Sequence, residues 1–394
     1  MRDNLRTLLV VSALFGLSAA IYETALPLYL DRAGISLVGM GWIYFLPALL
    51  AVCVPIVVGI GSDRAGRKGF YALALVAQGI GTLLTPLFAT ATAQLVVKAV
   101  REPWFRVRET LHSLLVQRDA PGDFLRVFGR TRGLEYFAQF LGLVAAAGGL
   151  RLLALGRAAG AVEMTLLAAG AIMLVNAALF ATAYREAAPT AAQGMGRPAM
   201  DLRDLLHPHL NRHLWLQMVS MFIFNIGLSC SHAFAPQVFF LERFKVSDAG
   251  LFLIMALHRL SIALPMAFAG RLVTQRLKAA YIGLVVIEGI LIGVPGYLMS
   301  FGWATGLWLL HDLVGAGVWW PIQHALLVRH CDEERRGRQL SVVLSLSALG
   351  MALGPLLAGY ISAAVPVGTE LRVGLPFIAG GALMVLSAVL LVFL

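Results

Sequence analysis

Charged and histidine side chains recur at helical spacing inside the apolar stretch 94–117. At 100° per residue they share one face of a helix with a phenylalanine, within an arc of about 120°. The set is Lys98, Arg101, Glu102, Phe105, Arg108, Glu109 and His112. Because a charge in apolar surroundings is costly unless it faces water or a partner, this face is expected to line a polar cavity.

Cations outnumber acids in this stretch by four to two: Lys98, Arg101, Arg106 and Arg108 against Glu102 and Glu109. The excess suits an anionic substrate group, which arginine can hold with two parallel hydrogen bonds. We predict substrate contacts for Arg101, Arg108 and His112, and an ion pair of Glu102 with Lys98 or Arg106 at i,i+4. The alternative is an internal salt-bridge network with acids of other helices.

The composition identifies the elements that must position these side chains. Hydrophobic residues make up 59% of the 394 residues and charged residues 13%, with a mean hydropathy of +0.81. Ordinary soluble domains have roughly 45–50% and about 25%. Stretches of about 20 apolar residues recur along the chain, which is the length that a membrane-spanning helix needs. Barrel strands would alternate over about 10 residues. The sequence therefore predicts an all-α polytopic membrane protein.

Twelve spans are predicted in two groups of six, separated by a polar, proline-containing segment. The first group is 5–30, 38–60, 70–90, 94–117, 133–152 and 161–183, and the second is 214–240, 249–270, 279–299, 303–328, 340–363 and 373–394. We accordingly predict an N-terminal six-helix bundle (1–183), a cytoplasmic linker (184–213) and a C-terminal six-helix bundle (214–394). The even division suggests duplication. The first stretch is too long for a signal peptide and is expected to be retained.

The positive charge follows this topology. With the N-terminus inside, inner segments hold 20 of the 31 Lys and Arg residues and outer loops hold 6. Cytoplasmic loops carry such an excess, so both termini are predicted to be cytoplasmic. The net charge of +10 therefore requires no nucleic-acid partner. Three scattered cysteines do not form a disulfide framework or a thiolate metal site.

The loop between the second and third spans carries a motif, Gly59-Ile-Gly-Ser-Asp-Arg-Ala-Gly-Arg-Lys68. It resembles the signature G-x-L-A-D-R-x-G-R-K of the major facilitator superfamily (MFS), with Gly61 where leucine is usual. The resemblance implies two pseudo-symmetric six-helix bundles and a conformational latch, in which Asp63 docks at the start of the eleventh span. The latch residues are Asp63, Arg64, Gly66, Arg67 and Lys68.

Two further segments match motifs of the family only partly. Residues 270–278 keep a glycine and cations of the same loop, but Thr274 replaces the acid. Residues 350–359 resemble the G-x-x-x-G-P-x-x-G-G element that exporters of the superfamily carry in span five. Small residues at such spacing also let helices pack closely, which is the alternative explanation.

The resemblance implies that spans 1, 4, 7 and 10 line a central cavity, and each carries polar residues. For substrate binding we predict Asn225, His232 and Trp319 besides Arg101, Arg108 and His112. For proton coupling we predict Glu23, Glu102, Glu109, Asp312 and His311. A carboxylate in such a place can exchange protons as the cavity opens to either side.

Other polar residues are interpreted structurally. Arg259 and Glu288 lie at matching depth in spans 8 and 9 and are predicted to form a structural ion pair. His207, His209 and His213 lack a clear fourth ligand, so no metal is predicted. No cofactor is expected, and the absence of H-E-x-x-H, G-x-S-x-G and P-loop patterns argues against an enzyme.

These features together predict a secondary active transporter that moves a small organic solute by alternating access between its two halves. Proton-coupled efflux, as an antiporter in a bacterial inner membrane, is the expected subtype, with a monomer as the working unit and lipids and a small, anionic solute as its partners. The alternative is a flippase or importer for an anionic amphiphile or metabolite. Outside transport, a membrane sensor or scaffold is the remaining possibility.

Overall fold

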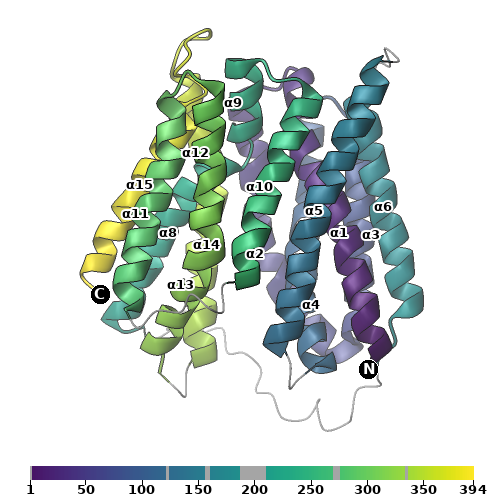
Figure 1. Cartoon of the computed structure of the whole chain (residues 1–394). Helices are drawn as coiled ribbons and strands as arrows, with labels where there is room; N and C mark the ends of the chain where they lie inside the picture. The colour runs from purple at the N-terminus through teal and green to yellow at the C-terminus, as the bar shows by residue number, and fades with distance from the viewer. Residues whose placement is uncertain (1, 121–123, 156–159, 187–209, 269–275, 333–335) are drawn as a thin grey trace. The chain divides into compact units, whose positions relative to one another are not determined.

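A computed structural model describes residues 2–120, 124–155, 160–186, 210–268, 276–332 and 336–394, and every element in them is helical (Figure 1). The helices before residue 187 are α1 (Arg2–Arg32), α2 (Leu37–Ala65), α3 (Arg67–Leu84), η1 (Thr85–Leu87), α4 (Ala91–Asp119), α5 (Phe124–Leu155) and α6 (Ala161–Ala183). Those after residue 209 are α8 (Arg212–His232), α9 (Ala235–Phe244), α10 (Asp248–Phe268), α11 (Leu277–Gly293), η4 (Val294–Tyr297), α12 (Phe301–Val314), α13 (Ala316–His330), α14 (Arg336–Ala363) and α15 (Leu375–Val392).

The helices are those of a polytopic membrane protein, as predicted. Ten helical segments of the described chain are long and apolar enough to cross a membrane. Two further predicted spans fall outside those ten for visible reasons. The 29-residue α4 carries the charged stripe, and the tenth span is broken at Gly315 into α12 and α13, of 14 and 15 residues. Each of the twelve predicted spans overlaps one helix or one such broken pair.

Local sequence determines where several helices begin. The side chains of Ser36, Thr90 and Asn211 accept hydrogen bonds from the backbone N–H three residues on, at 3.1, 3.4 and 3.0 Å. These are N-caps of α2, α4 and α8. Gly66, with φ +90°, separates α2 from α3, and side chains with a Cβ rarely adopt that conformation.

The chain forms two compact units. Unit 1 comprises Met1–Met195 and Phe240–Ala263, and unit 2 comprises Gly196–Phe239 and Leu264–Leu394. This division differs from the predicted 1–183, 184–213 and 214–394, because 240–263 joins the first unit. The predicted bundle boundaries stay a prediction.

The same packing order occurs within both units. In unit 1, α1 packs against α5 and α6, and α3 packs against α6; in unit 2, α8 packs against α14 and α15, and α11 packs against α15. An equivalent hydrogen bond occurs within each unit. Ser18 Oγ of α1 donates to the Ala169 carbonyl of α6, and Ser220 Oγ of α8 donates to the Ser387 carbonyl of α15. This repetition supports the duplication inferred from the sequence.

The glycines of the 350–359 element serve this packing. A Cβ on Gly350 would lie 2.3 Å from the Phe222 carbonyl oxygen, and one on Gly354 would lie 2.0 Å from Ser229 Oγ. Both contacts are on α8, so α14 approaches α8 more closely than larger residues allow. Close helix packing therefore accounts for these two glycines in this structure.

Candidate functional site

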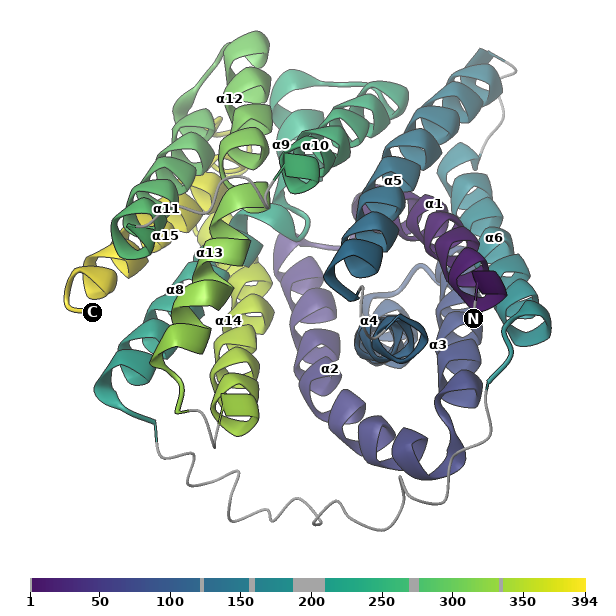
Figure 2. The ribbon, with the colours of Figure 1, turned by 60° about the horizontal axis from the view of Figure 1, so that its bottom comes forward.

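The polar stripe of α4 lies inside unit 1. The helix packs mainly against α2 and α3, and Figure 2 shows it end-on between them. Most stripe side chains are buried: Lys98, Arg101, Arg108 and His112 are 6%, 2%, 0% and 0% exposed. They fall into two groups with different surroundings, one around Arg101 and one around Arg108.

The Arg101 cluster comprises Tyr22, Tyr44, Thr82, Lys98, Arg101 and Glu102. The Arg101 guanidinium lies 3.5 Å from the centre of the Tyr22 ring, and its Nε donates to Thr82 Oγ1 at 3.1 Å. Lys98 Nζ lies 4.4 Å from the centre of the Tyr44 ring and donates to Glu102 at 2.8 Å. The last contact is the i,i+4 ion pair that the sequence predicts with Lys98.

The charges of this cluster do not cancel. Two cations, Lys98 and Arg101, stand against one acid, Glu102, and no carboxylate of the described residues pairs with Arg101. Its buried Nη2 also lacks a hydrogen-bond partner there. Glu102 interacts electrostatically with Arg101 as well as with Lys98, so one carboxylate serves two buried cations, and the aromatic face of Tyr22 offsets only part of the remaining cost. The cluster therefore suits an anionic group.

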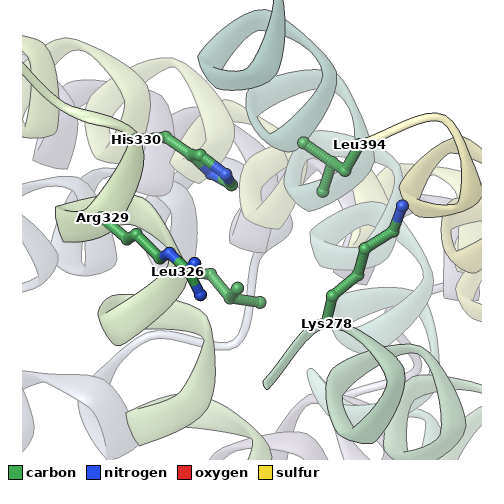
Figure 3. Close-up of a pocket in the computed structure, with 5 residues that line it drawn as sticks. All are labelled: Lys278, Leu326, Arg329, His330 and Leu394. Atoms are coloured by element: carbon green, nitrogen blue, oxygen red, sulfur yellow. The ribbon is translucent and has the colours of Figure 1, made fainter. Parts of the chain in front are cut away.

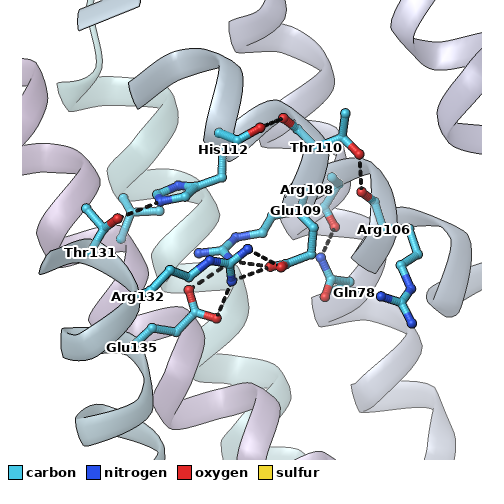
Figure 4. Close-up of polar contacts among 12 residues, drawn as sticks. Gln78, Arg106, Arg108, Glu109, Thr110, His112, Thr131, Arg132 and Glu135 are labelled. Carbon is cyan, nitrogen blue, oxygen red and sulfur yellow. Dashed lines mark hydrogen bonds and ion pairs between the residues drawn. The ribbon is translucent and has the colours of Figure 1, made fainter. Parts of the chain in front are cut away.

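The Arg108 network is compensated internally (Figure 4). Arg108 Nη1 donates to Glu109 at 2.6 Å and to Glu135 of α5 at 3.0 Å, and Nε donates to the Tyr71 hydroxyl at 3.1 Å. Arg132 of α5 donates to Glu109 and to Glu135, the latter at 3.1 Å. Two arginines and two glutamates thus balance, joining α4 to α5 as the salt-bridge alternative requires.

His112 belongs to the same side of α4 and bonds the Tyr71 hydroxyl and Thr131, both at 3.3 Å. The structure thus separates residues that the sequence grouped together. Nη2 lacks a hydrogen-bond partner in both Arg101 and Arg108, but only Arg108 has carboxylate partners, and the contacts of Arg108, Glu109 and His112 are those of a structural network. The roles predicted for these three residues stay predictions. Glu135 and Arg132 were missed, although they lie at i,i+3 on α5.

Arg259 and Glu288, which the sequence predicts to pair, belong to different units, and their pairing stays a prediction. Arg259 Nη2 of α10 donates to Glu23 of α1 at 2.6 Å, both residues belonging to unit 1. Glu288 of α11 is only 1% exposed in unit 2 and lies against the break between α12 and α13. Matching depth in neighbouring spans did not indicate Glu23 as a partner of Arg259, because the sequence does not show which faces of the helices meet.

Glu288 occupies the space that a side chain at Gly315 would need. An ideal Cβ there would lie 1.2 Å from Glu288 Oε2. We therefore expect Gly315→Ala to destabilise the protein by about 1–3 kcal/mol, as overpacking does, measured as a lower melting temperature of the detergent-purified protein. In a Glu288→Ala background the same substitution should cost less, since only the His311 carbonyl oxygen, 2.7 Å from the Cβ, would then remain in close contact. Equal costs in both backgrounds would contradict this packing.

The remaining predicted site residues lie in unit 2. Asn225 Nδ2 donates to the Ser347 carbonyl at 2.9 Å and so joins α8 to α14, and Trp319 packs edge-on against Phe224 with ring centres 4.7 Å apart. His232 Nε2 of α8 and His311 Nε2 of α12 are 2.9 Å apart, and His311 Nε2 is 3.2 Å from Asp312 Oδ1. Substrate contact for Asn225, His232 and Trp319 and proton coupling by His311 and Asp312 stay predictions.

The start of α3, where the motif predicts the latch, is capped by a residue that sequence reasoning missed. Glu186 follows α6 and accepts from the backbone N–H groups of Arg67 and Lys68, both at 2.9 Å. Arg118 at the end of α4 also donates to Glu186, at 2.8 Å. A carboxylate is stabilised at a helix N-terminus by these free N–H groups and the helix dipole. The side chains of Asp63 and Arg64 lie outside the described ones.

We expect this cap to depend on pH. Burial alone would raise the pKa of the Glu186 carboxyl, but the Lys68 and Arg67 N–H groups and Arg118 hold it below its ordinary value. A carboxyl whose pKa is lowered by folding contributes stability above the unfolded-state pKa of about 4.3 and loses it as the pH falls through the folded-state pKa. Glu186→Gln should therefore lower the melting temperature at neutral pH, with the difference vanishing in acid. An exposed control, Glu370→Gln, should show no such trend.

A pocket of about 230 Å³ lies elsewhere in unit 2 (Figure 3). It is lined by Lys278, Leu326, Arg329, His330 and Leu394, none of which is a predicted site residue. His330 also stacks on His213, with ring centres 5.0 Å apart. The other two linker histidines, His207 and His209, lie outside the described residues.

Comparison with known proteins identifies the fold. No family model matches the chain, and no curated protein matches its sequence. Among solved structures, the nucleoside transporter NupG has a TM-score of 0.79 at 15% identity, covering 100% of this chain and 99% of its own. The human organic anion transporter MFSD10 (TETRAN) has 0.67 at 17%, covering 99% of both chains. A bacterial homologue of the lysosomal transporter Spinster, inward-facing, has 0.70 at 13%, covering 99% of this chain and 94% of its own. The chain has the fold of MFS transporters.

Proposed function

We propose that this protein is a secondary active transporter of a small organic anion, working by alternating access. The observation that carries the anion is the Arg101 cluster, where a buried guanidinium has an unsatisfied Nη2 and no carboxylate partner among the described residues. The fold, shared with transporters of nucleosides, organic anions and peptides, supports transport as the activity.

The same cluster supports proton coupling. Glu102 is held as a carboxylate by Lys98, 2.8 Å away. When a solute anion binds Lys98 and Arg101, it neutralises their positive charge. These cations then no longer stabilise the negative charge of Glu102 in its dehydrated site, so Glu102 binds a proton. Solute and proton would bind together and cross together. This linkage describes symport, and an inward proton gradient would then drive uptake of an anionic metabolite.

Proton-coupled export is the second candidate. Its support is the resemblance of 350–359 to the exporter element, although close packing on α8 already accounts for Gly350 and Gly354. The two candidates differ in the sign of proton flux. When solute enters vesicles containing the purified protein and a trapped pH dye, symport acidifies the lumen, whereas antiport makes it alkaline.

The experiment that tests the proposal begins with a ligand screen. The melting temperature of detergent-purified protein is measured at two pH values with organic anions, organic cations, sugars and lysolipids. A ligand that binds the folded state raises it. Organic anions should stabilise the protein and then exchange across vesicle membranes in the dye assay. Stabilisation by cations or neutral solutes alone would overturn the anion assignment, and absence of flux for every stabilising solute would favour a sensor or scaffold.

A further inference from the structure

Two arginines of α4 each lie beside a buried tyrosine of another helix, and the two tyrosine hydroxyls have different surroundings. The Tyr71 hydroxyl accepts from Arg108 Nε at 3.1 Å and lies 3.3 Å from His112 Nδ1. The Tyr22 ring lies 3.5 Å from the Arg101 guanidinium, yet its hydroxyl has no hydrogen-bond partner among the described residues. Tyr22 is 1% exposed and Tyr71 is 0% exposed, so burial does not distinguish them.

The Tyr22 hydroxyl is close to a second buried donor without a partner. Arg101 Nη2 has no hydrogen-bond partner among the same residues, and its guanidinium lies against the ring that carries the hydroxyl. Arg108 Nη2 also lacks a partner, but the charge of Arg108 is paired with two glutamates. Burying a polar group without a hydrogen bond is destabilising. Two such donors side by side, from α1 and α4, therefore indicate an acceptor that the chain itself does not supply.

The charges of the Arg101 cluster indicate what this acceptor is. One carboxylate, Glu102, serves the two cations Lys98 and Arg101, so a further negative charge is favoured there. Lys98 Nζ donates to Glu102 at 2.8 Å and lies 4.4 Å from the centre of the Tyr44 ring. The donor atoms without a partner in the described part of the cluster are thus Arg101 Nη2 and the Tyr22 hydroxyl.

Two donors match the two oxygen atoms of a carboxylate. A sulfonate or a phosphate would bring a third oxygen into a dehydrated place without a matching donor, and that is costly. The Lys98–Glu102 pair has 7% and 20% of its side chains exposed, whereas Arg101 is 2% exposed. A solute carboxylate would therefore approach the two donors from the side of this pair.

We propose that Tyr22 binds the solute together with Arg101, so that one oxygen of a solute carboxylate accepts from the Tyr22 hydroxyl and the other from Arg101 Nη2. This inference rests on the proposed function. It adds a specificity-determining residue on α1 and names the chemical group that the cluster recognises.

The test is Tyr22→Phe, which removes the hydroxyl and keeps the ring that lies against Arg101. The dissociation constant of the best carboxylate from the screen is measured from its concentration-dependent stabilisation of the full-length, detergent-purified protein. A hydrogen bond to a charged group is lost, so we expect affinity to fall by about 10- to 100-fold. The melting temperature without ligand should be unchanged or slightly higher, because the hydroxyl has no partner among the described residues.

Tyr71→Phe is the matched control, since it removes an equally buried hydroxyl that the Arg108 network uses. It should lower the melting temperature without ligand and leave the dissociation constant unchanged. Wild-type affinity of Tyr22→Phe would overturn the proposal. So would a lower melting temperature of unliganded Tyr22→Phe, because the hydroxyl would then already have a partner.

The experiment separates this inference from the proposed function. If Arg101→Ala loses binding and Tyr22→Phe does not, only the role of Tyr22 fails. If no organic anion binds the wild type, the proposed function fails with it. Solutes of one carbon skeleton test the chemical group: the carboxylate should bind more tightly than the sulfonate or the phosphate monoester, and the reverse order would refute the carboxylate.

Discussion

Arg101→Ala is expected to abolish solute binding while leaving the unliganded protein nearly as stable as the wild type. Removing a buried charge from its partner costs about 2–5 kcal/mol, which is on the order of 100-fold or more in affinity. Among the described residues, the direct contacts of the Arg101 guanidinium are with Thr82 and the Tyr22 ring. Its removal therefore breaks no ion pair with a carboxylate of these residues. The measurement is the stabilisation of each variant by the best organic anion from the screen.

The control is Arg106→Ala on the same helix. Arg106 is exposed and lies 5.7 Å from the Phe105 ring, so its removal changes the charge of α4 equally and affects the Arg101 cluster only through its electrostatic interaction with Glu102. Arg101→Lys adds a finer comparison, since lysine keeps the charge but not the two parallel N–H groups. Full solute-induced stabilisation of Arg101→Ala would show that the anion binds elsewhere.

Arg108→Ala should have the opposite profile, with a large loss of stability. The substitution leaves Glu135, which is 3% exposed, and Glu109 with Arg132 as their remaining cation. Breaking a buried ion-pair network in this way costs about 3–5 kcal/mol. The expected result is a much lower melting temperature in detergent than for the exposed control Arg130→Ala on α5.

A double-mutant cycle isolates the cause. Adding Glu135→Gln to Arg108→Ala removes the acid that the first change leaves uncompensated, so the double variant should be more stable than the sum of the single effects requires. Strictly additive losses would show that Arg108 and Glu135 do not interact in the folded protein.

The sequence was a good guide to the helices and to the buried stripe because both depend on local properties. Long apolar runs define spans wherever they occur, and a period of 3.6 residues places Lys98 to His112 on one face. The i,i+4 pair of Lys98 with Glu102 is equally local and is present.

Contacts between helices could not be predicted from the sequence in the same way. Nothing local distinguishes Arg101, which pairs with no carboxylate of the described residues, from Arg108, whose charge is neutralised by Glu135 of another helix. Arg259 pairs with Glu23, 236 positions away, and Glu186 caps a helix that starts 119 residues earlier. Such pairings depend on which faces meet, and a single sequence does not encode that in any local pattern.

The charge on α4 also affects how the chain enters the bilayer. This helix is not among the ten segments that qualify as spans by apolarity. Each Arg, Lys or acidic residue at a helix centre costs about 2.5–3.5 kcal/mol on insertion by itself, and α4 carries several of them. We therefore expect α4 to enter the bilayer together with α2, α3 and α5, which shield its polar face, rather than by itself. Contacts with neighbouring helices, more than contacts with lipid, would then keep this segment in the membrane. The same charged residues that form the candidate site would therefore make membrane insertion of α4 depend on the rest of unit 1.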